Sequence, residues 1–169
     1  GGYVYVTRGL LAALNNESEL ASVIGHEIAH VTLHHGAKLM IRTIGAQIFS
    51  VAGVIASPKN AGAWSAISTA LFQQINMGYG REAELESDLQ GMLNSVEAGY
   101  RPISMVNFLK NLRKHEIMSG QVYHGFQASH PETKERIVKA GTFALSLSQK
   151  YTASINNKNI YLQKLKGLV

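Results

Sequence analysis

The chain has 169 residues, of which 46% are hydrophobic and 16% charged, and this favours one globular domain over a disordered segment. Its net charge is +5, but the basic residues are scattered and form no stripe, so nucleic acid is not expected as a partner. There is no cysteine, which excludes disulfides and thiolate metal sites and leaves histidine and carboxylate as ligands for any zinc.

The first predicted element is a strand at Tyr3–Thr7, where β-branched and aromatic residues are concentrated. A short helix is expected at residues 10–14. A longer helix follows at residues 17–36, because its apolar residues recur with a period of 3.6. Gly36 is expected to end this helix.

Two strongly apolar stretches come next, Leu39–Ala56 and Ala63–Ile75, with a turn at Pro58 between them. The first is long enough to cross a bilayer, but Arg42 and Gln47 lie within it, and the charge alone costs ~2–3 kcal/mol in a membrane. We therefore expect both stretches to be buried or to line a groove in a soluble protein. Membrane association is the alternative.

Three further helices are predicted, at residues 81–98, 103–118 and 133–148. Gly99 is expected to close the first of them, and Pro102 suits the start of the second. Residues 119–129 are expected to form a loop. The predicted fold is therefore mostly α, of the α+β class, with a small β-sheet.

The segment His26-Glu27-Ile28-Ala29-His30 carries two histidines four residues apart on a predicted helix. One turn separates them, so both imidazoles project toward a single ion, and two neutral imidazoles suit zinc. Glu27 lies about 100° around the helix, where it can accept a proton from zinc-bound water and pass it to the leaving amine. The surrounding apolar residues favour this interpretation over a solvated helix, because buried histidine and glutamate need partners or a metal.

Such a site needs a third protein ligand and keeps a fourth position for water. In one class of enzyme a histidine six residues after His30 is that ligand, but Gly36 occupies the position here. The acid-dense helix at residues 81–88 offers two pairs of acids on shared faces, and these are Glu84 with Asp88 and Glu82 with Glu86. In either pair one acid can bind zinc while the other accepts the free N–H of a zinc-bound imidazole. The spacing leaves both pairs open.

Five separated motifs, in order, resemble the zinc metallopeptidase family that includes the CAAX prenyl proteases, HtpX and BepA. They are Gly1–Leu10, Leu20–Gly36, the acids after Arg81, Gly99–Pro102, and Ser129-His130-Pro131 with Arg136-Ile137. Arg101 departs from the family pattern, which has aspartate there. The resemblance covers residues 1 to about 140 and is strongest with the soluble BepA-like members.

The resemblance implies that Glu84 is the third zinc ligand and that Asp88 is the acid behind it. It implies that His130 lies near the zinc, where it occupies the open position or faces the substrate oxyanion. It also implies a gluzincin-like domain, and we expect Tyr3–Thr7 to flank its cleft and pair with substrate. Residues 1–150 are then a zinc metallopeptidase domain, as a fragment that lacks an amino-terminal part. Residues 151–169 are an extension or a connector to a missing domain.

The expected activity is endoproteolysis of unfolded or misassembled polypeptides with one Zn²⁺ per chain, since nothing in the sequence suggests a pocket for chain termini. The soluble relatives imply the bacterial periplasm. Two alternatives stay open: a non-catalytic, zinc-stabilised module that binds client proteins like a chaperone, and a membrane-associated prenyl-protein protease. The intact Glu27 argues against the first. Tyr79, Tyr100 and Tyr123 are unranked candidates for stabilising an oxyanion.

Overall fold

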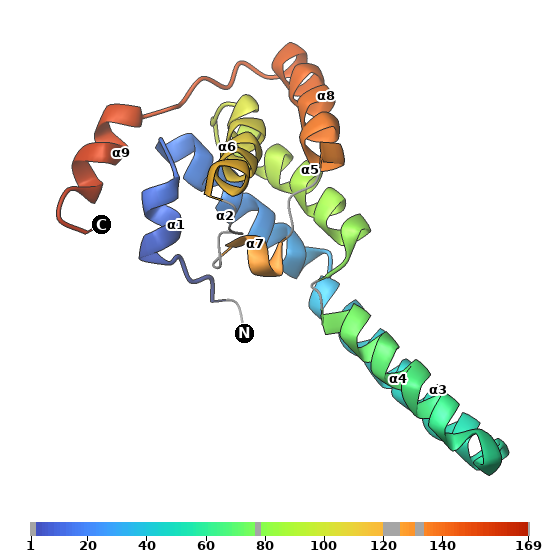
Figure 1. The fold of residues 1–169 in the computed structure, drawn as a ribbon. Helices are drawn as coiled ribbons and strands as arrows, with labels where there is room; N and C mark the ends of the chain where they lie inside the picture. Colours follow the sequence, from blue (N-terminus) through green and yellow to red (C-terminus); the bar gives the residue numbers. More distant parts are fainter. Residues whose placement is uncertain (1–2, 77–78, 120–125, 131–133, 169) are drawn as a thin grey trace.

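The computed structural model describes residues 3–76, 79–119, 126–130 and 134–168 of the chain, and most of them are helical (Figure 1). The helices in chain order are α1 (Arg8–Ala13), α2 (Glu17–Thr32), α3 (His35–Ala56), the 3-10 turn η1 (Pro58–Asn60), α4 (Ala61–Asn76), α5 (Arg81–Glu97), α6 (Ile103–Ser119), α7 (Phe126–Ser129), α8 (Lys134–Lys150) and α9 (Lys158–Leu165). The prediction of a mostly helical chain is confirmed. The short helix α7 falls within the range that was predicted to be a loop.

Figure 1 shows a helical body from which the α3–α4 hairpin projects. In the body α2 packs against α5 and α6, and α8 packs against both of those helices. The buried apolar side chains of these four helices include Val23, Met92, Val96, Phe108, Leu109, Ala140, Ala144 and Leu147. Each of these side chains other than alanine contributes ~1.5–3 kcal/mol when fully buried, so this core fixes the position of α2 within the body.

The helices α2 and α5 touch through two glycines. A Cβ on Gly25 would lie 2.6 Å from the carbonyl oxygen of Gly91, and a Cβ on Gly91 would lie 2.5 Å from the backbone nitrogen of His26. Contact at this distance requires that neither residue has a side chain. The closest approach of the two backbones therefore falls beside the first histidine of the predicted metal motif.

The end of α2 differs from the prediction. The helix begins at the predicted place, where the Asn16 side chain accepts a hydrogen bond from the Glu19 backbone N–H. It ends at Thr32, however, and Gly36 lies inside α3. The chain turns at His34, which has a left-handed φ of 57°, a conformation that histidine adopts more readily than most residues. Glycine is therefore not needed at this turn.

The expected β-sheet is wrong for the described residues, where the pairing present is an isolated parallel bridge between Tyr100 and Ile155. Tyr3–Thr7 is not helical but joins no sheet, and Tyr3 and Tyr5 are 83% and 86% exposed. The local pattern correctly indicated a non-helical segment. A strand also needs a neighbouring strand to pair with, and the rest of the described chain is almost entirely helical.

The expectation that residues 39–75 are buried is also wrong for α3. Seven large apolar side chains on α3 are exposed, and these are Met40, Ile41, Ile44, Ile48, Phe49, Val51 and Ile55. Only 11% of the 18-residue window of α3 with the highest mean hydropathy is buried. By length and composition the helix is apolar enough to cross a membrane. The opposite side packs on α4, where the Phe49 and Trp64 rings lie 5.5 Å apart and the Trp64 ring covers Gly53. A two-helix hairpin buries the side between its helices, which leaves the outer side of α3 exposed.

The residues after α8 return to the helical body. Ile155 bridges to Tyr100, and Tyr161 and Leu165 of α9 are buried in the core. The Tyr161 hydroxyl donates a hydrogen bond of 2.8 Å to the Leu11 carbonyl. Residues 151–165 thus pack on the same body as α1. That residues 151–169 lead into a further domain stays a prediction.

Candidate metal centre

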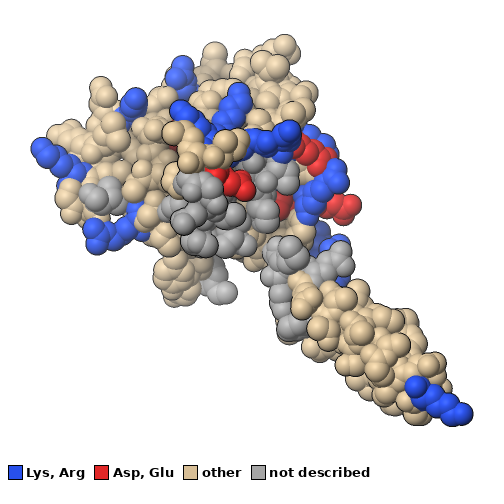
Figure 2. Space-filling model, in the orientation of Figure 1, with Lys and Arg blue, Asp and Glu red and all other residues tan. Residues whose placement is uncertain are grey.

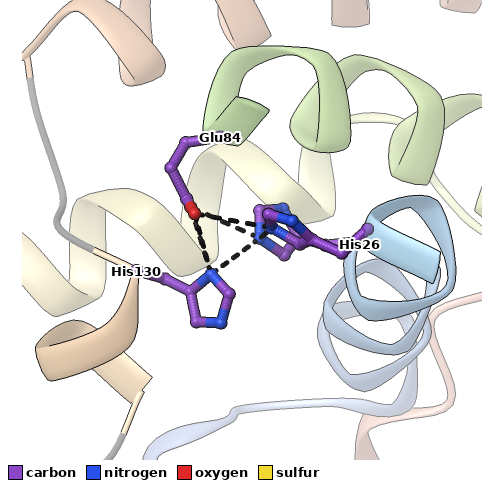
Figure 3. A group of neighbouring side chains, drawn as sticks. His26, Glu84 and His130 are labelled. Carbon is purple, nitrogen blue, oxygen red and sulfur yellow. Dashed lines mark hydrogen bonds and ion pairs between the residues drawn. The ribbon is translucent and has the colours of Figure 1, made fainter. Parts of the chain in front are cut away.

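Four side chains from separate parts of the chain meet at one buried point: His26 and His30 of α2, Glu84 of α5, and His130 after α7. Figure 3 shows His26, Glu84 and His130 pointing toward one another. The two α2 Nε2 atoms lie 3.0 Å apart, and His130 Nδ1 lies 3.3 Å from the His26 Nε2 atom. Oε1 of Glu84 lies 3.0 Å from His130 Nδ1 and 3.5 Å from His30 Nε2, and Oε2 lies 3.4 Å from His26 Nε2.

These distances fit one tetrahedrally coordinated ion. Ligands that lie 2.0–2.1 Å from zinc in a tetrahedron lie roughly 3.3 Å from one another. The pairs above are 3.0–3.5 Å apart. The chemistry of the donors agrees, because the ionised Asp88 can only accept the Nδ1 proton of His26 at 3.0 Å, which leaves Nε2 of the neutral ring to face the cluster with its lone pair. Lone pairs that face a carboxylate repel one another unless a cation lies between them, so the residues present fit a bound metal.

Arg136 holds the two carboxylates at the back of the cluster. Its Nε and Nη2 each donate to Asp88 at 2.7 Å, and its Nη1 lies 3.0 Å from Glu84 Oε2. Burial alone would raise the pKa of Asp88, but the hydrogen bonds from Arg136 and His26 lower it below its usual value. Burial would likewise raise the pKa of Glu84, but the hydrogen bonds from His130 and His26 and the charge of Arg136 lower it below its usual value. Both acids therefore stay ionised, as a divalent cation requires.

The environment of His30 also suits metal binding. Burial, reinforced by the neighbouring His26, lowers the pKa of His30 to about 3. The ring is therefore neutral near pH 7, and a neutral imidazole is the form that binds a metal. Tyr79 covers this ring, with the two ring centroids 4.3 Å apart.

Glu27 lies beside the cluster rather than within it, at the position expected from its place on the helix. Its Oε1 atom lies 3.4 Å from Nε2 of His130, and its side chain is 29% exposed. The two nitrogens of His130 therefore face different partners, because Nδ1 points into the cluster and Nε2 points toward Glu27. His130 thus stands where a fourth ligand of a tetrahedral ion would be.

A cleft of about 620 Å³ opens beside the cluster. It is lined by the Tyr3–Thr7 segment, by Glu27 and His30 of α2, and by Tyr79 and His130. The Tyr3–Thr7 segment therefore flanks the cleft, as predicted, although it joins no sheet.

Other candidates from the sequence lie elsewhere. Tyr100 donates to Glu17 at 2.8 Å, away from the cluster, and Tyr123 lies outside the described residues. Glu82 is exposed, and Arg81, which precedes the acids, pairs with Glu135. Of the two acid pairs that spacing left open, the structure thus brings Glu84 with Asp88 to the histidines.

Two contributors to the centre were not singled out as site residues from the sequence. Arg136 appeared there only as part of the resemblance, and nothing in its local pattern indicated that it would be 1% exposed behind two acids. His35 follows the metal motif by five residues, beyond the turn where the helix direction changes. Its contact with His30, at 3.0 Å between the two Nδ1 atoms, depends on that turn.

The model of the family described as "Peptidase family M48" matches residues 1–143 of the chain. The beta-barrel assembly-enhancing protease of Yersinia pestis is 34% identical over 120 residues, which is 66% of this chain and 24% of that protein. The protein of the same name from Escherichia coli K12 is 28% identical over 99% of this chain and 35% of its own length. The mitochondrial metalloendopeptidase OMA1 of Arabidopsis thaliana is 27% identical over 80% of this chain and 26% of that protein. This chain therefore spans about a quarter to a third of the length of these relatives. No solved structure was found to match it.

Proposed function

The chain belongs to peptidase family M48, and from this we propose that it is a zinc-dependent endopeptidase that hydrolyses unfolded or misassembled polypeptides. The observation that carries the proposal is the convergence of His26, His30 and Glu84 on one buried point. Two imidazoles and one carboxylate from two helices are the protein ligands of many catalytic zinc sites.

In the proposed mechanism His26 and His30 would hold zinc through the Nε2 atoms that face the cluster, and Glu84 would add a carboxylate oxygen. When bound, zinc supplies the Lewis acid that polarises the scissile carbonyl and acidifies a water. Glu27 stands beside the cluster with its carboxylate in the cleft, so it is the general base that accepts the proton and delivers it to the leaving amine. Asp88 accepts the Nδ1 proton of His26 and so fixes the ring that binds the metal.

We propose that His130 is the fourth ligand in the conformation observed, because its Nδ1 atom lies 3.0 Å from Glu84 and 3.3 Å from His26 Nε2. Water needs that position during hydrolysis. His130 therefore has to turn away before cleavage, and once turned it can face the substrate oxyanion. The substrate itself lies along Tyr3–Thr7, which borders the cleft and has backbone groups that can pair with an extended chain.

The proposal is tested with Glu27→Gln. This variant should keep zinc near the wild-type level, because Glu27 lies outside the cluster, while casein cleavage falls by at least about 100-fold. Glu97→Gln, an exposed change on α5, is the matched control and should cleave normally. A chelator should abolish wild-type cleavage, and re-added zinc should restore it.

Cleavage by Glu27→Gln at the wild-type rate would refute the base assignment. A wild-type protein that holds zinc and binds unfolded casein without cutting it would instead support the chaperone-like alternative, which needs neither Glu27 nor an open coordination position.

We also propose a lipid surface as a second partner, contacted by the α3–α4 hairpin. Between Glu27 and Arg81 the charged residues are Lys38, Arg42 and Lys59, so the hairpin region carries no acid. Figure 2 shows the hairpin as an almost uncharged surface with a basic group at its free end. An exposed aliphatic side with basic residues suits a bilayer that contains anionic lipids. The observation favours the membrane-associated form of the activity, and prenyl-protein cleavage stays an alternative within it.

For the location we propose the bacterial periplasm, on the strength of the resemblance to BepA-like proteins. The name of the Arabidopsis relative points to mitochondria for that protein. Fractionation of cells that express the full-length protein distinguishes a periplasmic location from an internal one.

A further inference from the structure

His35, the first residue of α3, connects the metal cluster to an acid that the proposed mechanism does not use. Its Nδ1 atom lies 3.0 Å from Nδ1 of His30, and its Nε2 atom lies 3.1 Å from Oε2 of Glu86. Its ring is buried, with 3% exposure, and Ser87 Oγ lies 3.2 Å from its Nδ1 atom. A continuous line of contacts thus runs from the cluster through His30 and His35 to Glu86.

The acid at the end of this line determines where the protons lie. The carboxylate of Glu86 only accepts, so Nε2 of His35 is the donor and its Nδ1 carries the lone pair. That lone pair accepts the N–H on Nδ1 of His30. The Nε2 atom of His30 is then bare and faces His26 and Glu84, at 3.0 and 3.5 Å. This is the tautomer that a metal ligand needs.

His26 has a shorter version of the same arrangement, since its Nδ1 atom reaches Asp88 directly at 3.0 Å. Both imidazoles of α2 are therefore backed by an acid of α5, one directly and one through His35. The left-handed turn at His34 makes the second connection, because it separates α2 from α3 and places His35 beside His30.

We propose that His35 and Glu86 are positioning residues for His30, which hold its ring in the orientation and tautomer that bind the metal and so raise metal affinity. The inference rests on the proposed metal site but not on proteolysis. Outer partners of zinc-bound histidines typically contribute 10–100-fold to affinity. Glu86 acts through His35, and neither residue contributes an atom to the four-ligand cluster.

The test measures zinc affinity of the purified chain by competition with a chromogenic chelator. His35→Leu should weaken zinc binding about 10–100-fold. His35→Gln should recover much of the loss, because its amide can both accept from His30 and donate to Glu86. Glu86→Leu should weaken binding about 10-fold, and because the Glu86 side chain is 57% exposed the change does not disturb the core. Glu82→Leu, an exposed acid one turn earlier on α5, is the matched control and should bind zinc normally.

Unchanged affinity in His35→Leu or in Glu86→Leu overturns the inference. Equal loss in His35→Leu and His35→Gln does so too, because a defect of packing would not be repaired by a polar side chain. If Glu84→Ala loses zinc while Glu86→Leu keeps it, only the positioning role fails. If Glu84→Ala also keeps zinc, the proposed metal site itself fails.

Discussion

Three acids lie within five residues of α5, and each makes a different contact. They are Glu84, Glu86 and Asp88. Successive residues are about 100° apart, so Glu84 and Asp88 share one face while Glu86 points roughly the opposite way. Glu84 enters the cluster, Asp88 accepts from His26, and Glu86 reaches the cluster only through His35. The two acids on the shared face are also the two that Arg136 holds.

Glu84→Ala is expected to lose zinc, because it removes both a ligand and the negative charge nearest the metal. The loss should exceed the 10–100-fold effect that removal of an outer partner causes. Metal analysis after dialysis measures it, with Glu82→Ala as the control that retains zinc. Undiminished zinc in Glu84→Ala would contradict its assignment as a ligand, and with it the proposed metal site.

At the scale of elements, the contact of Gly25 with Gly91 sets the distance between the helix that carries the histidines and the helix that carries the acids. A methyl group on Gly91 would lie 2.5 Å from His26 N and 2.8 Å from Gly25 C, and both are backbone atoms that cannot rotate away. Any side chain here must therefore push α2 and α5 apart. The metal ligands move with those helices.

Gly91→Ala should therefore destabilise the fold by about 1–3 kcal/mol, as overpacking of a close contact does, and should also weaken zinc binding. Gly141→Ala on α8 is the matched control. A Cβ there meets nothing within 4 Å, so this change should be neutral or stabilise by about 0.5–1 kcal/mol. Thermal unfolding of the two variants checks both expectations. Equal melting temperatures for Gly91→Ala and wild type would show that the helices tolerate separation.

At the scale of the whole molecule, the helical body and the α3–α4 hairpin differ in what they bury. The body encloses a core and the metal cluster, whereas α3 leaves its outer aliphatic side uncovered by the described residues. At 100° per residue, six of the seven exposed large apolar side chains of α3, all except Phe49, fall within a sector about 100° wide. A face of this kind is what a helix presents to a bilayer.

The wild-type chain should float with vesicles that contain anionic lipid and bind neutral vesicles less well, because the hairpin region carries only basic charges. Ile48→Asp and Ile55→Asp should reduce flotation several-fold, since each places a charge on the exposed face. Ile117→Asp, at a similarly exposed isoleucine of α6, is the control that should float normally. Flotation that survives both hairpin changes would exclude this face as the lipid contact.

Much of the site was predictable because its key spacing is local. A separation of four residues on a helix puts His26 and His30 on one face, and the same rule pairs Glu84 with Asp88. Local periodicity likewise predicted most of the helices. The exposure of α3 and the absence of a sheet around Tyr3–Thr7 among the described residues were not predictable, because an apolar pattern does not show whether a partner is present to cover it or pair with it.

The sequence alone determined the helices and the residue types able to hold a metal, since both depend on neighbours within a turn or two. Only the tertiary structure decided which acid pair meets the histidines, how Arg136 closes the back of the centre, and that His35 links His30 to Glu86. These contacts join residues 48 to 62 positions apart or lie across the turn between α2 and α3. They depend on how the helices pack. The close packing of α2 on α5 requires Gly25 and Gly91, and the sequence shows of these two residues only that they lack a side chain.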